Sequence, residues 1–326
     1  MAMLLSAPFS PRWFHEEEAP RLGSMNVMSG VIARAEGKQP GIIPDLRRAP
    51  TLFIGSDSGG QHSDAEYEVT GFLCSNRETL GDWEAARSRL RETMLPNQRR
   101  MSYKGLNDKY RQRALLPFLA AANRIPGLLF IIAIDRRIES VFQGPSEIPE
   151  LKSWKAQSVE RLMRTIHIAS LLARGMSAEG QDLWWFTDED EIAANEERLR
   201  LLVNLFAGLT SNYLSHNMRH MRIGTTKSDT GRRDIEDYVS ICDLAAGTVQ
   251  DCLAREGMKI ALKNPSLFIP KGQVQLAKVA TIMDWLADNS QPLKRLILVM
   301  DEDGGRPRCT HLRLHGTRDP KSWLAV

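Results

Sequence analysis

The 326-residue sequence has little of what marks several classes of protein. Its four cysteines are widely separated and form no CxxC pair, so neither a zinc ribbon nor a disulfide framework is expected. The formal net charge is only +3, which permits a polyanionic partner without requiring one. No apolar run approaches the length of a membrane span, and the apolar start of the chain is too short for a signal peptide. We therefore expect a reduced, cytoplasmic globular protein that does not contact a membrane.

Two kinds of catalytic signature are also missing. The turn Ser58-Gly59-Gly60 lacks both the glycine spacing and the following helix of a P-loop or Rossmann phosphate loop. Serine and cysteine hydrolase signatures are absent as well. These absences argue against nucleotide-driven and acyl-transfer chemistry.

Apolar runs and helical periodicity predict an α/β protein. The expected order is an irregular N-terminal arm with one short helix, then strands and helices that form a mixed sheet with helices on its faces. The expected strands cover residues 51–57, 66–74, 128–134, 182–188 and 219–225. The expected helices cover residues 80–94, 109–123, 152–174, 196–214, 235–255 and 276–286. A final hairpin is expected from strands at 295–300 and 308–314, which turn at Asp303-Gly304-Gly305. We divide the chain into an arm (1–49), a main domain (50–258) and a C-terminal helix and hairpin extension (259–326).

Three of these elements present carboxylates where an active site would form. Asp57 and Asp188 each end an apolar strand, and Asp243 lies among apolar residues of the helix expected at 235–255. Active sites of α/β proteins collect at strand ends, and Mg²⁺ prefers carboxylate oxygens. The same residues also have ordinary structural explanations, since Asp57 could stabilise a turn and Asp188 could cap a helix. The pattern indicates a site for Mg²⁺ or Mn²⁺, with Asp190 as the substitute for Asp188.

These segments resemble a known family. The strand followed by Asp57-Ser58-Gly59, the second strand that ends in Asp188, and the late helix Cys242-Asp243-Leu244-Ala245-Ala246-Gly247 are similar to the RNase H-like proteins catalogued as domain of unknown function 3800. The resemblance covers roughly residues 51–255. It implies an RNase H-like mixed central sheet with helices on both faces. It also implies a metal-dependent nuclease site to which Asp57, Asp188 and Asp243 would contribute.

The chain departs from this family in one segment that matters for catalysis. The family tends to carry an acid before its next helix, whereas residues 99–104 are basic here. Glu236 lies seven residues before Asp243, on the same helical face, and could supply the missing carboxylate. The basic segment itself has two interpretations. Its residues could contact a nucleic-acid backbone, with an aromatic ring for base stacking, or could form an ordinary solvated face. The expected contacts are Arg99, Arg100, Tyr103 and Lys104, followed by Arg111 and Arg113.

The favoured hypothesis is a nuclease that depends on Mg²⁺ or Mn²⁺ and acts on nucleic acid. The alternative is an RNase H-like binding or scaffold protein that has lost catalysis, within a bacterial defence or mobile-element system; the basic segment favours it. A phosphohydrolase for a small molecule is the third hypothesis. The sequence leaves open whether the chain forms a homo-oligomer or joins a larger assembly.

Overall fold

A mixed β-sheet forms the centre of the molecule. The computed structural model describes residues 12–13, 23–59, 65–138, 140, 148–189, 192–229, 231–254, 266–268 and 277–315. The sheet has eight strands in the order β5-β4-β1-β2-β3-β7-β8-β6. The strands are β1 (Thr51–Gly59), β2 (Tyr67–Asn76), β3 (Gly127–Asp135), β4 (Asp182–Thr187), β5 (His220–Thr225), β6 (Ser266–Phe268), β7 (Leu293–Asp303) and β8 (Arg306–His315). The helices are α1 (Ser24–Lys38), α2 (Gly81–Met94), α3 (Lys109–Ala122), α4 (Ala156–Met176), α5 (Glu196–Tyr213), α6 (Asp234–Leu253) and α8 (Ala277–Leu286).

The first five strands have a simple topology. β2 runs antiparallel to both β1 and β3, while β4 runs parallel to β1 and β5 runs parallel to β4. The parallel pairs are joined through helices, because a parallel connection must return the chain to the same end of the sheet.

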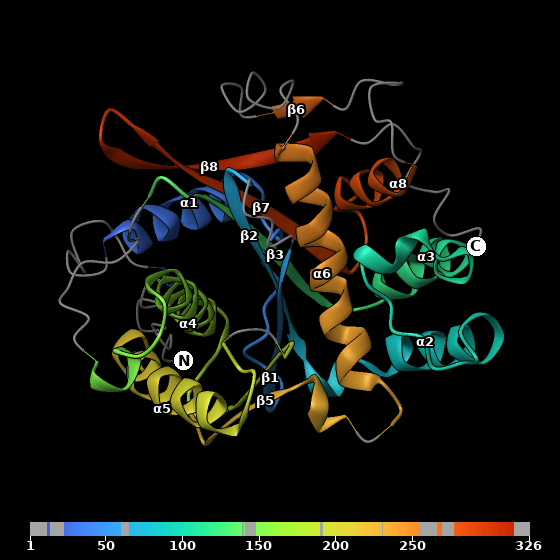
Figure 1. Cartoon of the computed structure of the whole chain (residues 1–326), viewed down its shortest axis with the longest axis horizontal. Coiled ribbons are helices and arrows are strands. Elements are labelled where there is room, and N and C mark those ends of the chain that lie inside the picture. The colour runs from blue at the N-terminus through green and yellow to red at the C-terminus, as the bar shows by residue number, and fades with distance from the viewer. Residues whose placement is uncertain are drawn as a thin grey trace, which may run out of the picture.

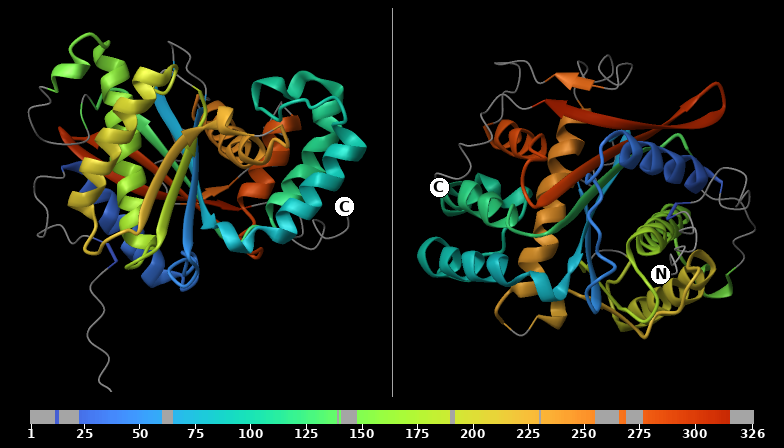
Figure 2. Two further views of the ribbon diagram at one scale, coloured as in Figure 1. Left: turned by 90° about the horizontal axis from the view of Figure 1, so that it is seen from below. Right: turned by 180° about the vertical axis from the view of Figure 1, so that it is seen from behind.

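Helices cover the two faces of the sheet in separate groups. Figures 1 and 2 show α2, α3, α6 and α8 on one side of the sheet, and α1, α4 and α5 on the other. Two apolar clusters match these layers. One joins β-strand residues such as Phe53 to α6 and α3, and the other joins Leu52 and Ile54 to α4 and α1. The predicted α/β class, a mixed central sheet with helices on both faces, is confirmed. None of the helices in the described part of the chain is long and apolar enough for a membrane span.

The C-terminal hairpin belongs to the central sheet. β7 pairs parallel with β3 along its length, from Gly127 opposite Leu293 to Ile134 opposite Met300. β7 and β8 pair antiparallel, and Asp303 lies opposite Arg306. The two residues between them are Gly304 and Gly305, whose φ angles are 60° and 78°. Positive φ at both positions is the requirement of a tight two-residue hairpin turn, so the turn was predicted correctly. Residues 259–326, which we expected as an extension, thus supply a strand next to β3.

Residues of the expected N-terminal arm also join the core. The structure forms α1 here, which buries Met25, Met28 and Ile32. Figure 1 shows α1 beside α4 on the face of the sheet opposite α6. The arm therefore contributes a helix to one apolar layer.

Helix α6 lies against the sheet with almost no side chain between the two backbones. A Cβ atom added to Gly59 of β1 would lie 2.6 Å from the Ala246 carbonyl carbon. A Cβ atom added to Gly71 of β2 would lie 2.9 Å from the Cys242 carbonyl oxygen. Real Cβ atoms do not approach so closely, so glycine at these positions lets the helix lie directly on the strands. This contact sets the position of Asp243 relative to Asp57.

Candidate active site

Parallel pairing brings two of the predicted carboxylates to one edge of the sheet. Ser56 of β1 lies opposite Thr187 of β4, so the next residues, Asp57 and Asp188, follow at the same end of neighbouring parallel strands. Asp57 is buried, with 8% of its surface exposed, and its Oδ1 accepts a hydrogen bond from the Ser58 amide at 2.7 Å. This strand edge is where α/β folds place their ligand sites.

Arg100 lies in the middle of the acidic residues. One Nη of its guanidinium lies 2.5 Å from Asp188 Oδ2 and 3.8 Å from Asp57 Oδ2. Its Nε lies 3.5 Å from Glu236 Oε1. The three carboxylates come from β1, from the end of β4 and from α6, so a single cation joins three elements that are distant in the sequence. We define Asp57, Asp188, Glu236 and Asp243 as the acidic cluster.

The neighbouring carboxylates raise the pKa of Arg100. Burial acts to lower it, but the hydrogen bond to Asp188 and the negative charges of Asp57 and Asp243 act more strongly together, and the pKa is raised above its ordinary value. The guanidinium therefore stays charged at any physiological pH.

Asp243 is placed by the segment that carries Arg100. Its Oδ2 accepts a hydrogen bond from the Tyr103 amide at 2.7 Å. Burial raises the pKa of Asp243 and the charge of Asp188 adds to this effect, while the Tyr103 amide and Arg100 oppose it. The net shift is upward. A buried acid whose pKa is perturbed in this way is a candidate for a functional site.

The backbone of Arg99 and Arg100 is fixed by two other arginines. Arg91 of α2 donates to the Arg99 carbonyl at 3.2 Å, and Arg111 of α3 donates to the Arg100 carbonyl at 2.6 Å. Met101 next to them is fully buried. The main chain of this segment is therefore held against α2 and α3, although it has no regular secondary structure.

The start of α6 is organised by Asp229. Its Oδ1 accepts from the Arg233 amide at 2.8 Å, and its Oδ2 accepts from the amides of Ile235 at 3.0 Å and Glu236 at 3.3 Å. These are amides that a helix N-terminus leaves without intrahelical partners. Glu236 in turn pairs with Arg233. Sequence reasoning missed Asp229, although an acid a few residues before a helix is a recognisable capping signal.

An open cavity of about 600 Å³ borders the acidic cluster. Its lining carries both charges, because Asp188 and Glu236 of the cluster lie beside cationic side chains. Asp188 also accepts a hydrogen bond from Thr226 Oγ1 at 3.0 Å, and the neighbouring Glu189 pairs with Lys227 at 2.9 Å. The cavity is lined by Gln98, Arg100, Asp188, Glu189, Thr226, Lys227, Asp229, Gly231, Arg233 and Glu236. The lining therefore places cationic side chains, which could contact a polyanion, beside the carboxylates of Asp188 and Glu236.

The donor chemistry of the cluster suits a hard divalent cation, but the arrangement surrounds an arginine. Four carboxylates from β1, β4 and α6 are the oxygen ligands that Mg²⁺ and Mn²⁺ prefer. Among the residues that the structure describes, no three acid, histidine or cysteine side chains are grouped as ligands of one ion. Arg100 accounts for this, because it contacts the carboxylates that a metal would otherwise draw together. Their role as metal ligands stays a prediction, and Asp190 lies outside the described residues.

The predicted nucleic-acid contacts need correction. Arg99 pairs with Asp108 and lies over the Tyr110 ring, and Arg100 binds the acidic cluster. Tyr103 is 6% exposed, and its hydroxyl donates to Asp251 at 2.5 Å. The prediction that Tyr103 stacks on a base is wrong, because the alternation of charge and aromatic residues in a short segment does not reveal which side chains turn inward.

The environment of the Tyr103 ring explains its burial. Helix residue Gly247 lies against it so closely that a Cβ added there would be 2.5 Å from the ring, and the Lys278 ammonium lies 4.1 Å from the ring centroid. Lys104 is exposed, so among the four predicted contacts it is the one that solvent reaches most freely.

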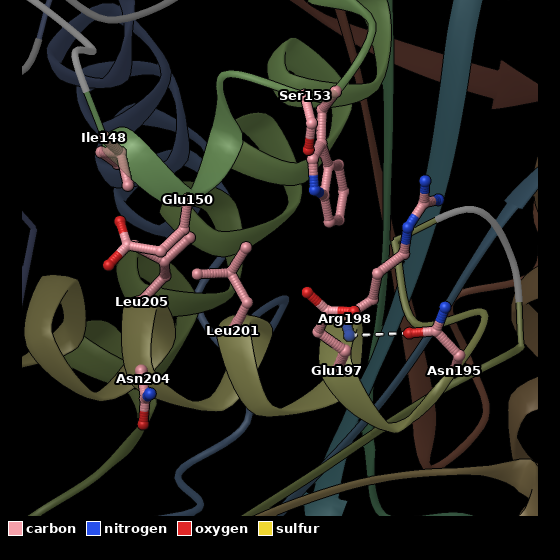
Figure 3. A pocket seen from close by; sticks show the side chains of 10 residues that line it. Ile148, Glu150, Ser153, Asn195, Glu197, Arg198, Leu201, Asn204 and Leu205 are labelled. Atoms are coloured by element: carbon pink, nitrogen blue, oxygen red, sulfur yellow. Dashed lines mark hydrogen bonds between the residues drawn. The ribbon is translucent and has the colours of Figure 1, made fainter.

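A second cavity of about 590 Å³ lies away from the acidic cluster, between residues 148–154 and α5. Figure 3 shows Leu201 and Leu205 beside Glu150, and Arg198 near Asn195. The Arg198 guanidinium lies 4.3 Å from the centroid of the Trp154 ring, and the Arg198 amide donates a hydrogen bond to Asn195 Oδ1 at 2.9 Å. This lining combines apolar and amide groups, with none of the clustered carboxylates seen at the first cavity.

Comparison with known proteins adds a fold-level likeness. No protein-family model matches the chain, and no curated protein matches its sequence. Among solved structures, the ribonuclease H2 of Pyrococcus horikoshii OT3 is similar over 72% of this chain and 85% of its own, with 12% sequence identity and a TM-score of 0.33. A likeness at this level carries no argument about residues or activity, so the function must be inferred from the geometry of this chain.

Proposed function

We propose that this protein hydrolyses phosphodiester bonds of nucleic acid with the help of a divalent cation, Mg²⁺ or Mn²⁺. The observation that supports this proposal is the convergence of Asp57, Asp188 and Glu236 on one point, with Asp243 close enough to affect the same guanidinium. These residues come from rigid elements at one strand edge, which is how phosphoryl-transfer sites hold their ligands in position.

Each group of the site has a role in this proposal. Asp57, Asp188 and Asp243 would hold the cation, and Glu236 would complete the set. When bound, a divalent ion would polarise a phosphoryl oxygen and lower the pKa of a water molecule. Arg233 and Lys227 lie at the cavity rim, where they would bind the flanking phosphates of the substrate.

Cleavage of labelled oligonucleotides tests the proposal. Single- and double-stranded DNA and RNA are incubated with the protein in Mg²⁺, in Mn²⁺ and in a chelator, and products are separated on denaturing gels. Asp243→Asn should reduce cleavage to background, because it removes one ligand charge while keeping the shape of the side chain. Asp182→Asn is the matched control, since Asp182 begins the same strand that Asp188 follows and pairs with Arg219 at 2.7 Å. Cleavage by Asp243→Asn at the wild-type rate would remove this residue from the mechanism.

A second candidate function is nucleic-acid binding without catalysis. The position of Arg100 favours it, because a guanidinium already neutralises the acids. Salt-sensitive binding of oligonucleotides in the absence of any cleavage, under every metal condition, would support this function over the first.

A further inference from the structure

The positive charge within the acidic cluster is the guanidinium of Arg100, which belongs to a connecting segment of the chain. Asp57 lies on a central strand, and Glu236 and Asp243 lie on a helix packed directly onto the sheet. Arg100 lies instead in the connection between α2 and α3, a segment without regular secondary structure, and its side chain reaches the cluster from there. The acids are therefore fixed by the core, while their counter-ion is attached to a different part of the fold.

The cluster needs a positive charge whether or not a metal is bound. The side chains of Asp57, Glu236 and Asp188 are 8%, 13% and 21% exposed. Carboxylates so close together and so poorly solvated repel one another, and some cation must balance them. Arg100 meets this need, with three contacts to three different acids.

A divalent ion and the guanidinium compete for the same oxygen atoms. Asp188 Oδ2 lies 2.5 Å from an Arg100 Nη, and that same Nη is the one nearest Asp57 Oδ2. A metal ion that bridged Asp57 and Asp188 would have to take the place of this nitrogen. Two cations cannot share that place, because their repulsion in a poorly solvated site is large.

We propose that Arg100 is an internal counter-ion that closes the acidic cluster to divalent cations, so that an ion binds only when the Arg100 side chain has moved out. This inference rests on the proposed function, because it concerns how the same carboxylates take up their metal. We call Arg100 the gate, because its guanidinium stabilises the carboxylates when no metal is bound. The free energy needed to displace it then sets the affinity of the cluster for the metal.

The structure indicates how the gate would open. The backbone carbonyls of Arg99 and Arg100 are held by Arg91 and Arg111, so the main chain stays in place. The Arg100 Nε is buried, and among the described residues it donates no hydrogen bond. Rotation about the side-chain torsions would move the guanidinium into the adjoining cavity of about 600 Å³. A phosphate of a bound polyanion would attract it there, since phosphate is a strong partner for a guanidinium.

Direct measurement of Mn²⁺ binding tests the inference without any reference to activity. Free Mn²⁺ is titrated by electron paramagnetic resonance into the full chain in the absence of nucleic acid, for wild type, Arg100→Gln and Arg99→Gln. Arg99→Gln is the matched control, because it removes the neighbouring arginine, which pairs with Asp108 instead of the cluster. Arg100→Gln should bind Mn²⁺ at least about tenfold more tightly than wild type, whereas Arg99→Gln should not differ from it.

Two further variants make the result decisive. Adding Asp243→Asn to Arg100→Gln should remove the gain, which assigns the bound ion to the cluster. Arg100→Lys keeps the charge but not the planar fork that reaches three acids, so its affinity should lie between wild type and Arg100→Gln. Should Arg100→Gln fail to fold in chelator, the comparison of Arg100→Lys with wild type decides. Equal Mn²⁺ affinity in wild type and the folded Arg100 variant would overturn the inference.

The outcome is separable from that of the proposed function. A gain of Mn²⁺ binding in Arg100→Gln, with no cleavage by any variant, would uphold the gate and refute the nuclease. Metal-dependent cleavage by wild type, with no gain of Mn²⁺ affinity in Arg100→Gln, would support the nuclease and refute the gate.

Discussion

Replacing Asp237 by Asn should be among the most damaging single changes in this chain. Asp237 follows Glu236 in the first turn of α6 and is fully buried. Its Oδ2 accepts from Arg87 at 3.1 Å and from Arg91 Nε at 2.5 Å, and its Oδ1 accepts from Arg91 as well. The two arginine side chains are only 5% and 7% exposed. The three residues form a buried ionic group that joins α2 to α6.

The cost follows from what the substitution leaves behind. Asn keeps the shape of the side chain, but it removes the negative charge that faces two buried guanidinium groups. Arg87 keeps Asp234 as a partner, whereas Arg91 keeps the Arg99 carbonyl, at 3.2 Å. Removing one partner of a buried ion pair typically costs about 3 to 5 kcal/mol. A domain of ordinary stability has about 5 to 15 kcal/mol in total, so the variant should be close to unfolding.

Urea denaturation followed by tryptophan fluorescence measures this cost. The midpoint should fall strongly while the slope stays unchanged, because the surface exposed on unfolding is the same. Glu196→Gln is the control, since Glu196 and its partner Arg200 are 92% and 81% exposed and this pair should contribute almost nothing. A loss of less than about 1 kcal/mol for Asp237→Asn would refute the reasoning, because it would mean that the two arginines find other partners or water.

Two further predictions concern the pH response and the packing of the chain. Burial lowers the pKa of His167 to about 4, so between pH 6.5 and 4 the unfolded chain takes up a proton that the folded one does not. The free energy of unfolding should therefore fall by roughly 3 kcal/mol across this window. In His167→Gln the free energy of unfolding should depend less on pH on the acid side. An unchanged pH dependence in this variant would show that His167 does not cause the loss of stability. Gly247→Ala should push the Tyr103 ring out of place and cost about 1 to 3 kcal/mol by thermal or chemical unfolding. At Gly208, where a Cβ meets nothing within 4 Å, the same change should be neutral or stabilising, and equal effects at the two glycines would contradict the packing argument.

Much of the fold was predictable because its elements have strong local signals. The continuous apolar run at 128–134 became β3 (Gly127–Asp135), and the helix expected at 276–286 became α8 (Ala277–Leu286). The place of the final hairpin was not predictable in this way. Its strand β7 pairs with β3, a segment far away along the chain, and nothing in either segment alone specifies that neighbour.

The candidate site was likewise predictable only in part. The acids at strand ends converged as expected, because parallel strands place their carboxyl ends together. The contacts of Arg100 with these acids were not predicted, since a run of basic residues looks like a surface for nucleic acid. Its hydrogen-bond partner Asp188 lies 88 residues away, and Asp243 is bound by a Tyr103 amide 140 residues distant. Contacts across such separations depend on how layers pack, which periodicity and composition do not encode.

The close contact of α6 with β1 and β2 has a consequence for how this site can evolve or be engineered. At Gly59 and Gly71 even a methyl group would separate helix and sheet, and such a separation would shift Asp243 away from Asp57. Gly59 and Gly71 therefore set the distance between helix and sheet, and with it the distance between the carboxylates of Asp243 and Asp57. Changes that tune the charge of the site should be tolerated more easily at the Arg100 side chain, which is not packed between α6 and the strands.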